Sequence, residues 1–391
     1  MRATASAHKP AIDPIATKEP AMSHAYPLPE GDAASLGLDT HRLAALDSLI
    51  ARHLEDGRYP GAQIAMARHG KLALFRTFGR ARTEAATVPA TDDTLFLLFS
   101  QTKVLTSATV WSLIEEGALS PMDRIADHLP EFAARGKADI TLHQVMTHQG
   151  GYPSSDVTPA TWADHARMRA EVCDFSLDWT PGSRMQYHGR AAHLTQAMVI
   201  EAITGHDYRN EIRDRILAPL GLEHDILVGV PEDQQHRCAD TYPAEIHRNN
   251  ADFRAAGLPH SGGYATARGM AAFYQALLGG GRLGRARVLS PRMIAYGSRN
   301  HTGDRPDFQM DGIPMHRGLG PHVRGDSERI RGLGTIGAPA TFGHGGVGSS
   351  YSWADPDSGV SFTYLTNYVQ PDPWHSARLD RISNIAHAAI L

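Results

Sequence analysis

The sequence predicts an α+β fold in which strands from both ends of the chain form one antiparallel sheet and helices occupy the middle. Strand-like runs occur at 63–79 and again at 342–368, whereas helical patterns dominate from about 96 to 299. This distribution indicates that the two ends meet in one sheet, with the helical part inserted between them. The expected sheet region therefore covers about 38–95 and 300–391.

The first expected elements are a helix and a hairpin. Asp39 can cap the start of a helix that runs to about Leu54, because its carboxylate can accept the free N–H groups of the first turn. Apolar residues recur there at helical spacing, at Leu43, Leu46, Leu49 and Ile50. Strand-like runs follow at 63–68 and 71–79, and the dipeptide His69-Gly70 between them is typical of a tight hairpin turn.

The middle of the chain is predicted to be mostly helical. A strand-like apolar run at 95–99 leads into Ser100, where a helix is expected to start and to continue to Glu116, ended by Gly117. This helix is apolar almost all round, which is typical of a helix in the interior of a large domain. Further helices are expected from about 190 to 204 and from about 265 to 277, and glycine follows each of them.

Strand character returns near the C-terminus. Runs at 342–353 and 360–368 flank the segment Asp355-Pro356-Asp357-Ser358-Gly359, which contains the residue types of a tight turn. The preceding stretch at 300–340 is rich in Gly, Pro and Arg and predicts loops. A final amphipathic helix is expected at about 376–390.

Composition limits the class of protein. The chain has 391 residues, of which 42% are apolar, and a net charge of -4 without any Lys/Arg patch, so neither nucleic acid nor a membrane is an expected partner. Residues 1–30 are expected to be a disordered tail, and 31–391 a single unit. Two cysteines are too few for a disulfide framework, and residues 1–30 lack the apolar stretch of a signal peptide, so a cytoplasmic protein is expected.

Ser100 and Lys103 form a Ser-x-x-Lys pair at the start of the predicted central helix. Residues three apart lie on one helix face, with Cβ atoms about 5–6 Å apart. A serine hydroxyl becomes a good nucleophile when a neighbouring base takes its proton, and a lysine can be that base if burial lowers its pKa from about 10.4. The pattern alone also fits a helix cap with a surface lysine.

Two further features support a nucleophilic site. Tyr187 follows the rigid turn Trp179-Thr180-Pro181-Gly182-Ser183, and its hydroxyl could share a proton with Lys103 and relay it to a leaving group. Its alternative role is aromatic packing. The segment Gly343-His344-Gly345-Gly346-Val347-Gly348 places glycines in a predicted strand, which marks either close approach by a ligand or a crowded strand crossing.

In this order, the Ser-x-x-Lys pair, the tyrosine segment and the glycine-rich strand resemble the three motifs of the serine β-lactamase and D,D-peptidase superfamily. The likeness is closest to its class C-like esterase branch and extends from about 40 to 391. Other landmarks resemble those of the family in the same order, at 123–132, 140–151 and 261–266.

The resemblance implies a helical domain beside an antiparallel sheet flanked by helices, with 31–391 as one catalytic unit. It implies a serine hydrolase in which Ser100 is acylated, Lys103 and Tyr187 move protons, and water hydrolyses the acyl-enzyme. It places the oxyanion hole at the backbone N–H groups of Ser100 and Val347. The residues expected to contact the substrate are His188, His344, Gly345 and Gly346.

Two departures from the family pattern bear on the substrate. The usual Tyr-x-Asn motif is replaced by Tyr187-His188-Gly189, so an amide-binding asparagine is missing. His344 stands where the lactamases have a lysine that helps to hold a substrate carboxylate, and a histidine is largely neutral near pH 7. Both changes disfavour penicillins and peptidoglycan stems, and they favour a carboxylesterase acting on small uncharged esters.

Other functions remain open at this point. An acyltransferase, an amidase or a weak β-lactamase would use the same scaffold, and a ligand-binding or sensor relative would keep the pocket without turnover. The chain has no G-x-S-x-G nucleophile elbow, and its G-x-G-x-x-G match at 332–337 is not followed by a helix start, so neither an α/β-hydrolase nor a nucleotide site is expected. Despite 22 histidines there is no HExxH, and neither a metal nor a cofactor is expected. The expected partner is a small ester or amide, and the oligomeric state is open.

Overall fold

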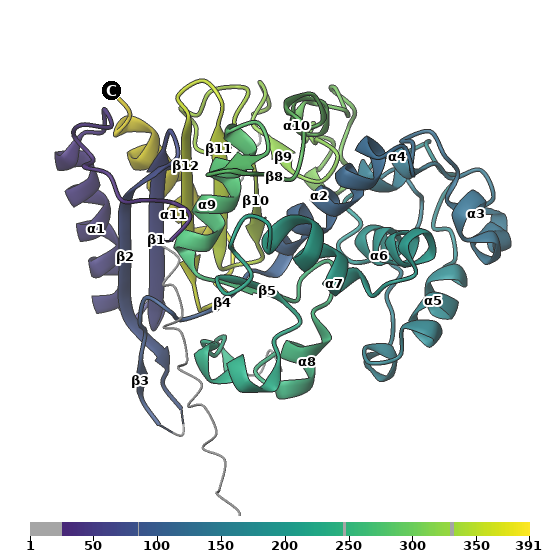
Figure 1. Cartoon of the computed structure of the whole chain (residues 1–391), viewed down its shortest axis with the longest axis horizontal. Coiled ribbons are helices and arrows are strands. Elements are labelled where there is room, and N and C mark those ends of the chain that lie inside the picture. The colour runs from purple at the N-terminus through teal and green to yellow at the C-terminus, as the bar shows by residue number, and fades with distance from the viewer. Residues whose placement is uncertain (1–25, 85, 245–247, 329–331) are drawn as a thin grey trace, which may run out of the picture.

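The computed structural model describes residues 26–84, 86–244, 248–328 and 332–391, and it has the predicted α+β architecture. A sheet region and a helical region lie beside each other (Figure 1). The main sheet has seven antiparallel strands in the order β3-β2-β1-β12-β11-β10-β9. Strands β1 to β3 come from the N-terminal part and β9 to β12 from the C-terminal part, so the two ends of the chain meet at the β1–β12 pair.

The elements have the following bounds. The strands of the main sheet are β1 (Gly61–Arg68), β2 (Lys71–Arg82), β3 (Val88–Pro89), β9 (His322–Val323), β10 (Phe342–Gly346), β11 (Ser350–Asp355) and β12 (Val360–Thr366). Smaller sheets contain β4 (Phe96–Leu97), β5 (Ile226–Val228) and β6 (Gly263–Ala265), and β7 (Arg282–Leu283) with β8 (Ala286–Arg287). The α-helices are α1 (Thr40–Glu55), α2 (Thr102–Glu115), α3 (Ile125–His128), α4 (Leu142–Met146), α5 (His165–Cys173), α6 (Ala191–Thr204), α7 (Tyr208–Ile212), α8 (Ala251–Ala256), α9 (Ala267–Leu278), α10 (Pro291–Ser298) and α11 (Trp374–Ala388).

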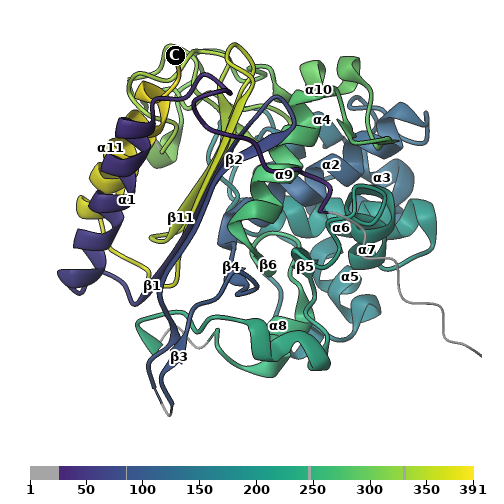
Figure 2. The ribbon, with the colours of Figure 1, turned by 60° about the vertical axis from the view of Figure 1, so that its left-hand side comes forward.

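The main sheet is covered on both faces. Figure 2 shows α1 and α11 side by side on one face, with α9 on the opposite face. Successive strand residues point to opposite faces, so Ile64 of β1 packs in the core beneath α1 and α11, whereas Ala65 belongs to the core shared with the helical region. Burial on both faces explains why β1, β11 and β12 are almost continuously buried.

Helix α2 forms the centre of the helical region. Its residues from Thr102 to Leu113 are all buried, as its apolar sequence predicts, and it packs against α6 and α7. Gly117, which follows α2, has a φ of 76°, and Gly205, which follows α6, has a φ of 73°. Both helices therefore end at the glycines that the sequence indicated.

The predicted N-terminal elements are confirmed in detail. The Asp39 carboxylate accepts hydrogen bonds from the backbone N–H groups of His41 and Arg42, and so caps α1. Between β1 and β2, His69 and Gly70 have φ values of 51° and 75°. Two successive residues with positive φ match the twist of a hairpin, so this two-residue turn joins the strands directly.

Three expectations are corrected. The run at 342–353 is not one strand: the chain reverses at Gly348, with a φ of 61°, and separates β10 from β11. The apolar run at 95–99 keeps only the two residues of β4 as strand. Regular α-helix starts at Thr102 rather than Ser100, because a turn of 3-10 helix (η1, Phe99–Gln101) precedes it.

The last residues of the tail expected at 1–30 are ordered in the structure. Leu28 is buried in the core, and the backbones of Pro29 and Gly31 pair with Leu72 of β2. These contacts fix residues 26–30 on the sheet edge. Residues 1–25 of the expected tail lie outside the described residues.

Two further findings concern membrane spans and cysteines. In the ranges that the structure covers, no helix is both long enough and apolar enough to cross a bilayer. Cys173 and Cys238 are free thiols, and both are buried.

The turn between β10 and β11 is held by a buried arginine of α11. The Arg378 guanidinium donates to the carbonyl groups of Gly348 and Ser349, both at 2.8 Å, and to the Tyr364 hydroxyl at 3.0 Å. Its Cζ atom lies 5.0 Å from the centre of the Trp374 ring. The helix on one face of the sheet thus fixes a turn at the end of β10.

Replacing Arg378 with Met should lower the free energy of unfolding by about 3 kcal/mol, because buried carbonyl groups would lose charged donors. Denaturant unfolding of the purified protein measures this change. Arg381 lies on the same helix but is exposed, so Arg381→Met should stay within about 0.5 kcal/mol of the unchanged protein. Equal effects of the two substitutions would contradict the assigned role of Arg378.

Candidate active site

Ser100 lies in a tight turn between β4 and α2. The residue before it, Phe99, has a φ of 50°, which is rare for a bulky side chain and stores strain in the backbone. The turn is held by β6: the Leu98 N–H donates to the Gly263 carbonyl at 2.8 Å, and the Gly263 N–H donates to Thr102 Oγ1 at 2.9 Å. This bracing keeps Ser100 in the 3-10 turn, where first-turn N–H groups have no helical partner.

Lys103 meets Ser100 inside the protein. The Lys103 Nζ lies 3.1 Å from Ser100 Oγ and donates to the His260 carbonyl at 2.8 Å. The lysine is completely buried, so it is not a surface residue on a helix cap. Burial lowers the pKa of Lys103, and the contact with Tyr187 only partly opposes this effect. A larger share of the amine is therefore neutral than in water, and a neutral amine can accept the serine proton.

Tyr187 faces the same pair. The Lys103 Nζ lies 5.2 Å from the centre of the Tyr187 ring, and the His148 ring packs 4.8 Å from it on another side. Burial raises the pKa of Tyr187. The Lys103 ammonium, contacts with the Ser100 and Lys103 side chains, and the charge of Arg317 all lower it. Together they outweigh burial, so the pKa of Tyr187 lies below its ordinary value. Lys103 and Tyr187 therefore each shift the pKa of the other.

These groups open into a pocket of about 450 Å³ at the junction of the sheet and the helical region. Besides Ser100 and Tyr187, it is lined by Gln309, His322, His344, Gly345, Gly346, Val347, Gly348, Tyr351, Val369, Gln370, Pro371, Asp372, His375, Ser376 and Leu379. The structure thus brings Ser100 and the predicted β10 residues around one cavity. Ser100 and Val347, the two predicted oxyanion-hole positions, lie on its wall, and the Val347 residue is 58% exposed.

His344 has a neighbour that the sequence did not indicate. The His322 ring stacks on the His344 ring with centres 4.1 Å apart, and its Nδ1 lies 3.0 Å from the Tyr351 hydroxyl. His322 belongs to no recognisable motif, and only the pairing of β9 with β10 brings it beside His344. Other pocket residues also carry no sequence signal: Gln309 lies in a 3-10 turn at 308–310, Tyr351 on β11 and His375 on α11.

His188 does not line this pocket, which corrects its expected role in substrate binding. Its side chain is completely buried behind Tyr187. The Tyr152 N–H donates to His188 Nε2 at 3.1 Å, and His188 Nδ1 lies 2.7 Å from the Gln186 carbonyl. Burial lowers the pKa of His188 to about 4. Both ring nitrogens are used by the backbone, so a neutral His188 supports the tyrosine segment from within.

The glycines of β10 are explained by crowding within the protein. A Cβ at Gly343 would lie 2.1 Å from the Ser352 carbonyl oxygen, and one at Gly346 would lie 2.7 Å from the Leu98 carbonyl oxygen. The second contact joins β10 to the segment that carries Ser100. Of the two explanations for these glycines, crowding at a strand crossing therefore applies to both positions.

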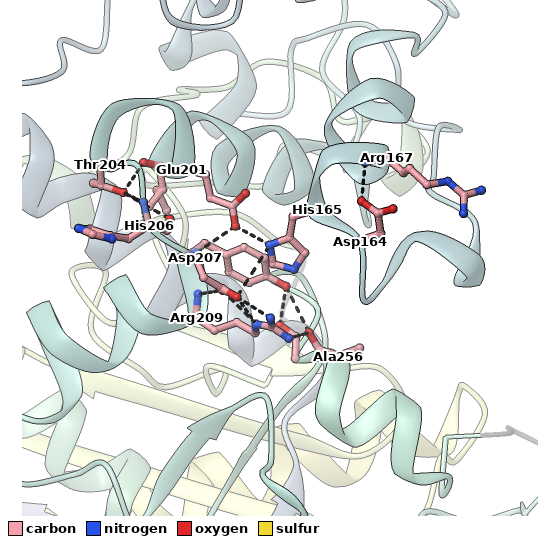
Figure 3. A network of polar contacts seen from close by, with 12 residues as sticks. Asp164, His165, Arg167, Glu201, Thr204, His206, Asp207, Arg209 and Ala256 are labelled. Atoms are coloured by element: carbon pink, nitrogen blue, oxygen red, sulfur yellow. Dashed lines mark hydrogen bonds and ion pairs between the residues drawn. The ribbon is translucent and has the colours of Figure 1, made fainter.

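A second polar cluster lies away from the pocket, between α5, α6 and α7 (Figure 3). His165, Glu201 and Asp207 place one ligand-type atom each within 4.8 Å of one another. However, the Arg209 guanidinium donates to both Asp207 oxygens, and His165 Nδ1 lies 2.6 Å from a Glu201 oxygen. We interpret the cluster as a polar contact that joins three helices, because both carboxylates already have a histidine or arginine partner.

A helix-borne serine beside a buried lysine, with a tyrosine over both and a glycine-rich strand at the edge of the pocket, is the arrangement of a serine hydrolase of the penicillin-binding type. The family model for β-lactamases matches residues 46–387. The chain therefore belongs to the β-lactamase family, and the resemblance inferred from its motifs is confirmed.

Individual relatives agree with this assignment. The esterase/β-lactamase LipL of Mycobacterium tuberculosis is 26% identical, and the match covers 87% of this chain and 84% of the relative. A penicillin-binding protein homolog from Caulobacter crescentus has a TM-score of 0.78 at 27% identity, covering 89% of this chain and 97% of the other. A family VIII carboxylesterase has a TM-score of 0.75 at 28% identity, covering 88% and 96%.

Replacing Lys103 with Met should slow labelling of Ser100 by a fluorophosphonate by about 10²–10⁴-fold, because the serine would lose its neighbouring base. Intact-protein mass spectrometry measures the labelling rate, and circular dichroism checks the fold. Lys137 is also completely buried but donates to three carbonyl groups elsewhere. Labelling of folded Lys137→Met should therefore stay near normal, and labelling of Lys103→Met within a few-fold of normal would refute the assignment of the base.

Proposed function

We propose that the protein is a carboxylesterase that hydrolyses small uncharged esters through an acyl-enzyme on Ser100. The observation that carries this proposal is the 3.1 Å contact between Ser100 Oγ and the buried Lys103 Nζ, beneath a pocket whose wall includes His344. The contact between Ser100 and Lys103 supports acyl transfer in general. The histidine at position 344 supports a neutral substrate.

In the acylation step, Ser100 Oγ attacks the ester carbonyl carbon while its proton passes to the coupled Lys103–Tyr187 pair. The carbonyl oxygen becomes an oxyanion, which the N–H groups of Ser100 and Val347 would stabilise from the pocket wall. When the C–O bond to the alcohol breaks, Tyr187 returns the proton to the leaving oxygen. The products of this step are a free alcohol and an acyl group on Ser100.

In the deacylation step, water attacks the acyl carbon and gives its proton to the same pair. The oxyanion forms again at the same two N–H groups, and the bond to Ser100 Oγ breaks as the serine regains its proton. The pair ends in its starting protonation state, so one ester and one water yield one alcohol and one acid. A single proton-sharing pair thus serves both half-reactions.

The charge of the pocket supports an uncharged substrate. Among the described residues that line the pocket there is no lysine or arginine, and Asp372 is an exposed carboxylate on the wall. The described part of the wall therefore places negative rather than positive charge beside a substrate carboxylate. This balance disfavours penicillins and peptide C-termini relative to neutral esters.

The test is a panel of chromogenic substrates with the unchanged protein and with Ser100→Ala. A neutral short-chain nitrophenyl ester should be hydrolysed with an initial burst, and Ser100→Ala should abolish both the burst and the turnover. The panel also contains a chromogenic cephalosporin and a D-alanyl-D-alanine peptide. Faster turnover of either than of every ester would replace the proposal with a β-lactamase or peptidase function.

Two other outcomes would also overturn the proposal. Transfer of the acyl group to an added alcohol or amine, with little hydrolysis, would make the protein an acyltransferase. No turnover of any substrate and no fluorophosphonate on Ser100 would indicate a ligand-binding relative.

Replacing His344 with Lys should raise kcat/KM for an ester that carries a carboxylate by about tenfold relative to a neutral ester, because one charge-assisted contact becomes available. The ratio of the two kcat/KM values at pH 7 measures this preference. His41→Lys adds the same charge on the exposed surface of α1 and should leave the ratio unchanged. A ratio that does not move in His344→Lys would mean that position 344 does not face the substrate.

A further inference from the structure

A second cation lies against the Tyr187 ring. The Arg317 Cζ atom lies 5.1 Å from the centre of this ring, a separation close to the 5.2 Å of the Lys103 Nζ. Arg317 comes from the loop between η7 (Phe308–Met310) and β9, far along the chain from both Lys103 and Tyr187. It does not line the pocket, so it is placed to act on Tyr187 rather than on a substrate.

Arg317 is held by a buried carboxylate. Its Nη2 lies 2.7 Å from Asp307 Oδ2, and the two side chains are only 2% and 0% exposed. The other Asp307 oxygen accepts the Gln309 N–H at 2.9 Å. Next to Asp307, the Phe308 N–H donates to the Met185 carbonyl at 3.0 Å, two residues before Tyr187. A backbone hydrogen bond therefore joins the segment of Asp307 to the segment of Tyr187.

Burying the Arg317–Asp307 ion pair costs free energy of desolvation. A buried ion pair often stabilises a fold less than apolar residues of similar volume, because both ions lose their hydration. Here the Arg317 Nε and Nη1 atoms are buried and make no hydrogen bond with any described residue. Packing alone would be served as well by an apolar pair, so the retained charge suggests a role at the neighbouring tyrosine.

We propose that the Arg317–Asp307 pair positions the Tyr187 ring and supplies a fixed positive charge behind it, which helps Tyr187 to accept the Ser100 proton. Arg317 is then a positioning residue, because it acts through Tyr187 and touches no reacting atom. This inference deepens the proposed function and rests on it: it concerns how the same site activates its serine.

The charged groups that face Tyr187 determine the direction in which its pKa moves. Lys103 and Arg317 are cationic and favour the tyrosinate form, and Asp307 opposes it from behind Arg317. Burial lowers the pKa of His148 well below its ordinary range, so this neighbour is neutral. Two further titratable rings near Tyr187 among the described residues are those of His322 and His344, and no variant below replaces either of them.

The experiment measures the pH dependence of two rates, fluorophosphonate labelling of Ser100 and kcat/KM for a neutral ester. Removing the positive charge in Arg317→Met should raise the pKa of Tyr187 and move the acid limb of both profiles to higher pH by about one unit. Arg317→Lys keeps the charge and should recover at least half of this shift. Asp307→Asn removes the opposing carboxylate and should move the limb to lower pH.

The matched control is another guanidinium–carboxylate pair, in which the arginine is buried and the carboxylate is partly exposed. Arg254 Nη2 lies 2.7 Å from Asp240 Oδ1, outside the pocket, and folded Arg254→Met should keep the normal pH profile. The proposal is overturned if folded Arg317→Met keeps the normal profile, if the control shifts equally, or if Asp307→Asn shifts in the same direction as Arg317→Met. If Arg317→Met does not fold, the shift of Asp307→Asn to lower pH decides the question.

These outcomes are separate from a failure of the proposed function. If the unchanged protein were neither labelled at Ser100 nor active on esters, the serine mechanism itself would be wrong. If it were labelled with the expected pH profile but no charge variant moved that profile, only the role of Arg317 would be wrong.

Discussion

The site depends on keeping the amine of Lys103 out of water. In the proposed mechanism a lysine on an exposed helix would stay protonated and could not take the Ser100 proton, so the mechanism requires the apolar interior around α2. The same burial would make an isolated charge unstable. The amine donates to the His260 carbonyl and to Ser100 Oγ, and the Tyr187 ring packs beside it. The rest of the structure provides this enclosure.

The enclosure is assembled from three parts of the chain. Ser100 lies in η1 and Lys103 at the start of α2, Tyr187 precedes α6, and the C-terminal strand β10 closes the pocket. Strand β6 joins the first two through its hydrogen bonds to the serine turn. Helix α11 reaches through Arg378 to the turn at the end of β10. The two cores on either side of the sheet thus both contribute to the geometry of one site.

The sequence predicted most of what depends on local pattern. The Asp39 cap, the turn at His69-Gly70 and the order of strands and helices follow from residue type and spacing, and they are found as expected. The Ser-x-x-Lys spacing also predicts a contact between Ser100 and Lys103, because one helical turn brings them together. Residues that meet only through the fold could not be found in this way. His322 reaches His344 through strand pairing, Arg317 reaches Tyr187 through a loop, and the burial of His188 depends on neighbours distant in sequence.

The meeting of the two chain ends in one sheet has a consequence during synthesis. Ile64 of β1 pairs with Tyr364 of β12, so this central pairing cannot form until almost the whole chain has left the ribosome. The helical region lies between these two strands in the sequence, so it is translated completely before β12 and can become ordered earlier. The segment with Ser100 must then wait for β10, which is translated close to the end. In a nascent chain Ser100 consequently lacks a complete pocket until translation is nearly finished, because the β10 wall does not yet exist.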